Sequence, residues 1–403
     1  MIIWILALVL LAAGAGLGFR QGAIRAAISF VGIVSAVLFA GILGNLLKPL
    51  FPHIGIENPT FIWVLAPLEA FVIILIVFKI AGLMVHRKVH LFYKYKAGDL
   101  RLALWERLNS RLGLCVGLLN GTAYLLLASF VIYNFSYWTA QIAPSENEAR
   151  TTRVINQMGH DLETTGLAGT ARALVPLPDM YYKLADLAGL VCQNPQLSSR
   201  LANYPALLAI AERPDMQQIA QNNDFIQAWK QGAPMGQILN NPQVKALLQN
   251  RDLIDTVWEI LRNNLDDLTV YLKTGKSPKY DSEEILGRWD FNVNVSVGTL
   301  LIARPNLPAA EIKALRSLWS QAYAQTIFVA AADHQAFLEN MPRFRMENGM
   351  TTVAETKTWQ GQWNNAGTNY DLSLNGKSMT ARTDGLRLTI KSAADVWVFD
   401  REQ

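Results

Sequence analysis

The stretch that decides the fold is residues 26–47, AAISFVGIVSAVLFAGILGNLL, which holds 22 residues and no charge. A helix rises about 1.5 Å per residue, so this segment can cross roughly 30 Å of hydrocarbon. Three further apolar runs surround it, at residues 1–19, 61–85 and 112–138. A water-soluble core does not need four such runs in 140 residues, so we predict a four-helix transmembrane domain over residues 1–140.

The rest of the chain has an ordinary soluble composition. Although 51% of the 403 residues are hydrophobic, nearly all the long apolar runs end before residue 138. The net charge of +4 is too small to indicate a nucleic-acid partner. The two cysteines, Cys115 and Cys192, lie far apart in regions of different character, so we predict no disulfide framework and no metal site. No Gly-rich loop follows an expected strand to bind a phosphate, so we predict no cofactor.

The loop charges predict an orientation. Arg20 and Arg25 lie in the first loop, only Lys48 in the second, and seven lysines and arginines between residues 87 and 111 in the third. Basic residues in short loops mark the cytoplasmic side, so the N-terminus and residues 139–403 are expected in the periplasm of a bacterium. Because the first basic residue follows the first apolar run, we expect that run to stay as a membrane helix.

Two runs carry small residues at four-residue spacing, which lets membrane helices approach closely. These predicted packing residues are Gly32, Ala36, Ala40 and Gly44 in one run and Gly113, Gly117 and Gly121 in another. The stripes predict close packing, either within one subunit or between subunits of a homo-oligomer.

Four charged residues stand in or beside the apolar runs, namely Arg20, Arg25, Glu69 and Arg111. An ionisable side chain within the bilayer is costly and needs a partner or water. Glu69 lies about eight residues into the third run, just after Pro67. Two interpretations stay open: a buried structural carboxylate, or part of a proton or solute path together with Arg20 and Arg25.

Two segments carry a resemblance to a known family. Residues 18–25, GFRQGAIR, resemble the GFxRGxxR segment of the colicin V production (CvpA) family, and residues 111–121, RLGLCVGLLNG, resemble its RxxGxxxGxxRG segment. The resemblance covers residues 1–140. It implies a four-helix bacterial inner-membrane protein with its N-terminus outside, linked to colicin V production or export and to envelope integrity.

The sequence departs from the family pattern at four positions. Arg20 and Arg111 each lie one place off the family spacing. Asn120 stands where the later arginine of the second segment is expected, and Ala26 stands where an acidic residue commonly follows the first. A role that requires those charges is therefore in question for this chain.

Residues 141–278 have the pattern of a periplasmic domain of short, capped helices. The segment NPQLSSRLAN at residues 194–203 aligns with NPQVKALLQN at residues 241–250, and such short helices resemble the STI1-type modules of co-chaperones. The alternatives are a compact α-helical domain and a groove that holds an apolar segment. Residues 273–279, KTGKSPK, read as a linker.

Residues 280–403 predict an antiparallel β-barrel with one helix, which resembles lipocalin-like domains. The segment WDFNVNV at residues 289–295 alternates as a strand does, a helix is expected over residues 308–324, and seven further strands are expected between residues 326 and 400. Asn375-Gly376 and Asp384-Gly385 are typical hairpin turns. Trp289, Trp359 and Trp363 either fill the barrel core or line an apolar ligand pocket.

These patterns favour a non-enzymatic protein. The chain has no G-x-S-x-G-like segment and no carboxylate pair suited to acid/base chemistry. We predict a membrane anchor for periplasmic binding modules, serving toxin production or export, or envelope maintenance. Its partners would be the lipid bilayer, a second copy, and an envelope protein or apolar ligand. The alternative is an oligomeric channel or transporter that uses Glu69 with Arg20 and Arg25.

Overall fold

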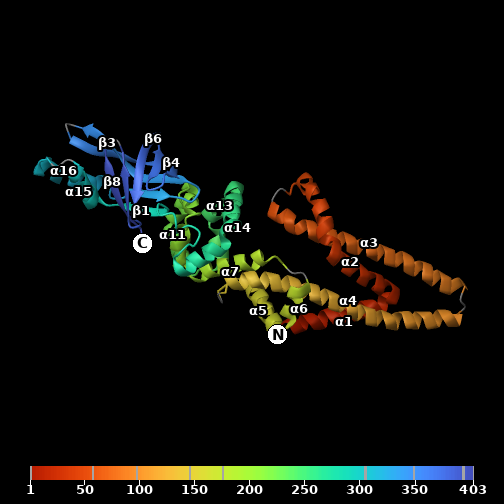
Figure 1. Cartoon of the computed structure of the whole chain (residues 1–403). Helices are drawn as coiled ribbons and strands as arrows, with labels where there is room; N and C mark the ends of the chain where they lie inside the picture. The colour runs from red at the N-terminus through yellow and green to blue at the C-terminus, as the bar shows by residue number, and fades with distance from the viewer. Residues whose placement is uncertain are drawn as a thin grey trace. The chain divides into compact units, whose positions relative to one another are not determined.

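The computed structural model describes residues 2–56, 59–96, 99–144, 147–174, 177–303, 306–347, 350–392 and 395–402 (Figure 1). The chain forms two compact units. The first comprises Met1–Ala140 and Ala149–Pro178, and the second comprises Gln141–Glu148 and Asp179–Gln403.

Long apolar helices dominate the first unit. Its elements are α1 (Ile2–Gln21), α2 (Ala23–Leu47), the 3-10 helix η1 (Lys48–Ile54), α3 (Pro59–Lys96), α4 (Asp99–Ile142), α5 (Arg150–Thr164) and α6 (Leu167–Leu174). In the described part of the chain, four helical segments are long and apolar enough to cross a membrane: Ile2–Gln21, Ala23–Ile54, Leu65–Tyr95 and Asp99–Ile142. The predicted four-helix membrane fold is confirmed.

The third loop is shorter than the sequence suggested. We expected a connection over residues 86–111, but α3 continues to Lys96 and α4 begins at Asp99. Lysine and arginine are good helix formers, so a basic segment can extend a membrane helix beyond the hydrocarbon. The basic residues of this region therefore lie on the ends of two long helices.

Helix α5 packs onto the bundle although its own sequence is polar. The hydroxyl of Thr139 in α4 donates to Asn156 Oδ1 at 2.6 Å, and the backbone N–H of Ile3 donates to Asp161 at 3.4 Å. Gly159 lies so close to Ser136 that a Cβ there would clash with it. The first unit therefore extends past the four apolar helices.

The second unit begins with short helices around one long one. They are α7 (Asp179–Gln193), α8 (Leu197–Ala202), α9 (Leu208–Ala211), α10 (Pro214–Ala220), α11 (Asn223–Lys230), α12 (Met235–Asn240), α13 (Pro242–Gln249) and α14 (Arg251–Thr274). Asn222, Asn241 and Asn250 cap α11, α13 and α14 with their side chains. The core of this part contains Leu187, Tyr204, Leu265, Leu268 and Leu272.

A closed antiparallel barrel follows. Its strands are β1 (Gly287–Phe291), β2 (Ile327–Ala330), β3 (Gln335–Glu347), β4 (Met350–Asn365), β5 (Tyr370–Leu374), β6 (Lys377–Thr383), β7 (Arg387–Lys391) and β8 (Val396–Arg401). Neighbours in sequence are neighbours in space, and β8 pairs with β1 to close the sheet. The predicted lipocalin-like barrel is confirmed.

The start of the barrel corrects one prediction. Residues 289–295 do not form one strand, because β1 ends at Phe291 and α15 (Val293–Ala303) begins two residues later. The Asn292 side chain accepts the backbone N–H of Val295 at 3.0 Å and thereby caps the helix. The one helix predicted in this domain, over residues 308–324, is α16 (Ala309–Ala322), so the described part of the domain has one helix more than expected. Figure 1 shows both helices beside the strands.

The barrel is attached to the short helices through its outer face. Leu208 of α9 is fully buried in one cluster with Val329 of β2, Ala331 just after β2, and Phe337 of β3. The backbone N–H of Ala332 donates to the Pro205 carbonyl at 3.1 Å. The helices from α7 onward and the barrel therefore form a single packed body.

Candidate functional site

The two segments that carry the family resemblance lie against each other. Gly18 of α1 packs on Gly113 and Gly117 of α4, and a Cβ on Gly18 would lie 2.6 Å from the Gly117 Cα. Gly14 approaches Gly121 in the same way, with a Cβ placed 2.9 Å from its Cα. The helices run antiparallel with their backbones in contact, which only glycine permits at these positions.

Gly22 joins α1 to α2 at one end of this contact. It has φ of +81° and is the single residue between the two helices. A Cβ there would clash with the Asn109 side chain, whose Oδ1 accepts the Ile24 backbone N–H at 3.4 Å. Asn109 of α4 therefore satisfies a free N–H at the start of α2.

The other small-residue stripe faces α3. Gly32, Ala36, Ala40 and Gly44 are all buried. A Cβ on Gly32 would lie 2.7 Å from the Phe78 Cβ, and one on Gly44 would lie 2.7 Å from the Pro67 backbone nitrogen. Both stripes predicted from the sequence thus form helix contacts within one subunit. Self-association remains a prediction, and it would have to use other surfaces of the helices.

An aromatic and basic cluster lies beside Arg25. The rings of His86 and His90 stack, and both lie within 6 Å of the Trp105 ring centroid. Arg25 Nε and His86 Nδ1 are buried and have no hydrogen-bond partner in the described part of the chain. Arg25 therefore lies within the bundle, against α3.

The remaining charged candidates do not join this cluster. Glu69, Arg20 and Arg111 are exposed on the surface of the helices. Glu69 follows Pro67 of α3, which contacts Gly44 of α2. Gly44 lies 19 residues after Arg25 on α2, and this separation corresponds to roughly 28 Å along the helix. The structure therefore does not bring Glu69 together with Arg25 at one site.

The three tryptophans of the barrel have different surroundings. Trp289 and Trp363 are buried in the core, where their indole N–H groups donate to the carbonyls of Ile285 and Ala331. Trp359 is only partly buried and lies edge-on to Trp397, with the Lys377 ammonium 4.6 Å from its ring centroid. None of the three lines the cavity among the short helices or the groove along β6, β7 and β8.

A cavity of about 540 Å³ lies among the short helices. Its apolar lining includes Ile142, Trp229, Met235 and Ile238, and Cys192 also borders it. Burial raises the pKa of the Cys192 thiol, which keeps it protonated and unreactive at neutral pH. A groove for an apolar segment, predicted from the repeat in this region, would use this part of the molecule.

A buried acidic group lies where the short helices meet the barrel. Glu212 forms an ion pair with Arg288 of β1 and accepts a hydrogen bond from Gln217 at 3.2 Å. Burial and a hydrogen bond with the Glu339 carboxyl raise the pKa of Glu212 to about 8, against the opposite pull of Arg288. Among the described residues, no three His, Cys, Asp or Glu side chains are grouped to hold a metal ion.

Sequence reasoning missed several residues of these contacts. Gly14, Gly18 and Gly22 form a third four-residue stripe, and their spacing could have identified it. Asn109 was not singled out, and Asn120 was noted only as a departure from the family pattern, because a single asparagine in an apolar helix does not predict its partner. Asn120 Nδ2 donates to the Ala26 carbonyl at 2.9 Å, which ties α4 to α2.

These features define a class of protein with four candidate membrane-spanning helices and a closed β-barrel that has an apolar core. Residues 4–160 match the family model described as Colicin V production protein, which confirms the resemblance carried by the two segments. The N-terminal part of this chain is therefore similar to the colicin V production family, and the match includes most of α5. No curated protein and no solved structure matches the chain.

Proposed function

We propose that this is a non-enzymatic protein of the bacterial inner membrane that anchors a periplasmic binding module. The module would comprise the short helices and the barrel, which pack as one body through Leu208 and the Glu212–Arg288 pair. Toxin production or export, or envelope maintenance, would be the process served. The observation that carries the proposal is the family match over residues 4–160, followed by a separate compact unit.

The distribution of charge supports the periplasmic placement. Arg20 and Arg25 stand at the junction of α1 and α2, and further basic residues stand on the facing ends of α3 and α4. Since basic residues are retained in the cytoplasm, this end of the bundle is expected inside the cell. Because α1 and α4 run antiparallel, the other end of α4 and the chain beyond it would then lie outside the cytoplasm.

Reporter fusions test the orientation. Alkaline phosphatase fused after Gln403 should be active, and a green fluorescent protein inserted between α3 and α4 should be fluorescent. A fluorescent fusion after Gln403 would refute the periplasmic assignment.

Complementation tests the role. In a strain that lacks the gene, the full chain should restore colicin V export and resistance to detergent. A variant truncated after residue 178 should fail to do so, although it reaches the membrane in equal amount. Full rescue by the truncated variant would show that the module is dispensable for this function.

A further inference from the structure

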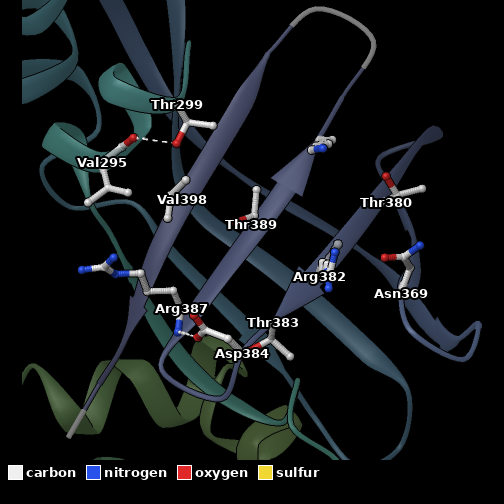
Figure 2. Close-up of a pocket in the computed structure, with 12 residues that line it drawn as sticks. Val295, Thr299, Asn369, Thr380, Arg382, Thr383, Asp384, Arg387, Thr389 and Val398 are labelled. Atoms are coloured by element: carbon white, nitrogen blue, oxygen red, sulfur yellow. Dashed lines mark hydrogen bonds between the residues drawn. The ribbon is translucent and has the colours of Figure 1, made fainter. Parts of the chain in front are cut away.

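A polar groove runs along the outer wall of the barrel (Figure 2). Its volume is about 760 Å³, and its floor is formed by outward side chains of β6, β7 and β8. Val295 and Thr299 of α15 form one side. The groove lies outside the packed core, because Met379, Ala381, Leu388 and Ile390 of the same strands point inward and are buried.

The strand register places three cations around one threonine. Arg382 of β6 pairs with Thr389 of β7, so Arg387 and Lys391 lie two residues to either side of that threonine. Each is a diagonal neighbour of Arg382, at roughly 7–8 Å between backbones, within reach of long side chains. The three cationic residues therefore flank Thr389 on one face of the sheet.

Only one of these cations has a carboxylate partner in the described residues. Arg387 Nε donates to Asp400 Oδ1 at 3.2 Å, whereas Arg382 and Lys391 form no ion pair there. The nearby Asp384 oxygen already accepts the backbone N–H groups of Leu386 and Arg387. Like charges this close repel each other, and an anion between them would relieve that repulsion.

The geometry points to a site for a phosphate ester, centred over Thr389 and held by Arg382, Arg387 and Lys391. Guanidinium groups bind phosphate oxygens in pairs, and a lysine adds a compact positive charge. The hydroxyls of Thr380 and Thr389 supply further donors, while Val295 and Val398 offer an apolar edge to the rest of the ligand. This inference rests on the proposed role of the barrel as a binding module and names the chemistry it recognises.

Binding can be measured on the full chain in phosphatidylcholine nanodiscs. Two probes distinguish the source of the phosphate: soluble glycerol 3-phosphate, followed by calorimetry, and vesicles containing phosphatidylglycerol, followed by co-flotation. Binding of the soluble ester indicates a free phosphate ester, and binding of the vesicles alone indicates a lipid headgroup. Either result supports the site if it weakens with added salt.

Matched variants locate the site. Arg382→Gln and Lys391→Gln should each weaken binding at least tenfold, and Thr389→Val, which keeps the side-chain size, should weaken it several-fold. Lys357→Gln removes an exposed cation from β4 and should leave binding unchanged. Failure of both probes, or wild-type binding by Arg382→Gln, would overturn the site. Purified protein binds regardless of its orientation in the cell, so the reporter fusions can fail independently.

Discussion

The side chain of Asn120 in α4 donates a 2.9 Å hydrogen bond to the backbone carbonyl of Ala26 in α2. These are two positions at which the sequence departs from the family pattern, which has an arginine and an acidic residue there. The two departures therefore meet in space. In this chain a neutral hydrogen bond joins the two positions.

Restoring both charges should be tolerated better than restoring one. Ala26 is 2% exposed, so Ala26→Asp alone buries an unpaired carboxylate and should destabilise the bundle by about 2–4 kcal/mol. Adding Asn120→Arg should recover at least half of that loss. A double-mutant cycle on denaturant unfolding in detergent measures the coupling. Ala27→Asp, on an exposed neighbour, is the control and should not be rescued by the same arginine.

The glycine contact between α1 and α4 should not accept even a methyl group. In Gly117→Ala the new Cβ would lie 2.9 Å from the Gly18 Cα, so the helices must separate, at a cost of about 1–3 kcal/mol. Gly18→Ala should cost a similar amount. Unfolding in detergent and the steady-state level in membranes provide the measurements.

Gly16 supplies the matched control for this contact. It lies on the same helix between Gly14 and Gly18, is exposed, and has open space where a Cβ would stand. Gly16→Ala should therefore leave stability unchanged or slightly raised, because alanine favours the helix. Equal losses at residues 16 and 18 would show that α1 does not pack on α4 through this face.

The membrane part of the fold was predictable because its signal is local. An uncharged run such as residues 26–47 indicates a spanning helix without any knowledge of its neighbours. The helix ends were not predictable, since the basic residues that close α3 and open α4 are compatible with both helix and loop. Likewise, the alternation of residues 289–295 matches a strand, but the Asn292 cap starts a helix within it.

The polar groove on the barrel could not be predicted from the sequence, for a different reason. Arg382, Arg387 and Lys391 alternate with apolar residues, as outward side chains on strands do. That they gather around Thr389 depends on the register between β6 and β7, which the Asp384-Gly385 turn sets. The alternating pattern identified most of the apolar positions of the barrel, but their arrangement in space depends on which strands pair.

Asp267 should hold the connection from α14 to the barrel in place. Its carboxylate accepts the Tyr204 hydroxyl at 2.7 Å, the Ser277 hydroxyl at 2.6 Å and the Lys279 backbone N–H at 3.0 Å. Residues 273–279, expected to be a linker, are thus fixed, and Ser277 is fully buried. Asp267→Asn should cost about 1–3 kcal/mol, because an amide cannot accept all three bonds equally well.

The acid side of the stability curve tests the same carboxylate. Burial alone would raise the pKa of Asp267, but the hydrogen bonds from Ser277 and Tyr204 outweigh it and lower that pKa. The stabilisation is therefore present above the ordinary aspartate pKa and is lost as the pH falls below it. Asp266→Asn changes an exposed neighbour paired with Lys183, and this variant should lose as much stability at acid pH as the wild type does. Asp267→Asn should lose less stability than the wild type as the pH falls.

Glu212 should give the second unit an opposite pH dependence. Its pKa is raised to about 8 in the folded protein, first by burial and then by Glu339, from an ordinary value near 4.5. Between these values the folded protein binds more protons than the unfolded chain. The stabilisation is thus complete below pH 4.5 and is lost as the pH rises through 8, with a slope of at most about 1.4 kcal/mol per unit.

A glutamine at this position separates the titration from the packing. Glu212→Gln cannot ionise, so thermal unfolding between pH 5 and 8 should become flatter, and the barrel should remain docked on α9. Glu339→Gln removes the neighbouring carboxyl, which should lower the pKa of Glu212 and move the loss of stability to lower pH. Glu355→Gln, on the exposed part of β4, should retain the wild-type profile. An unchanged slope in Glu212→Gln would mean that Glu212 remains ionised beside Arg288 throughout this range.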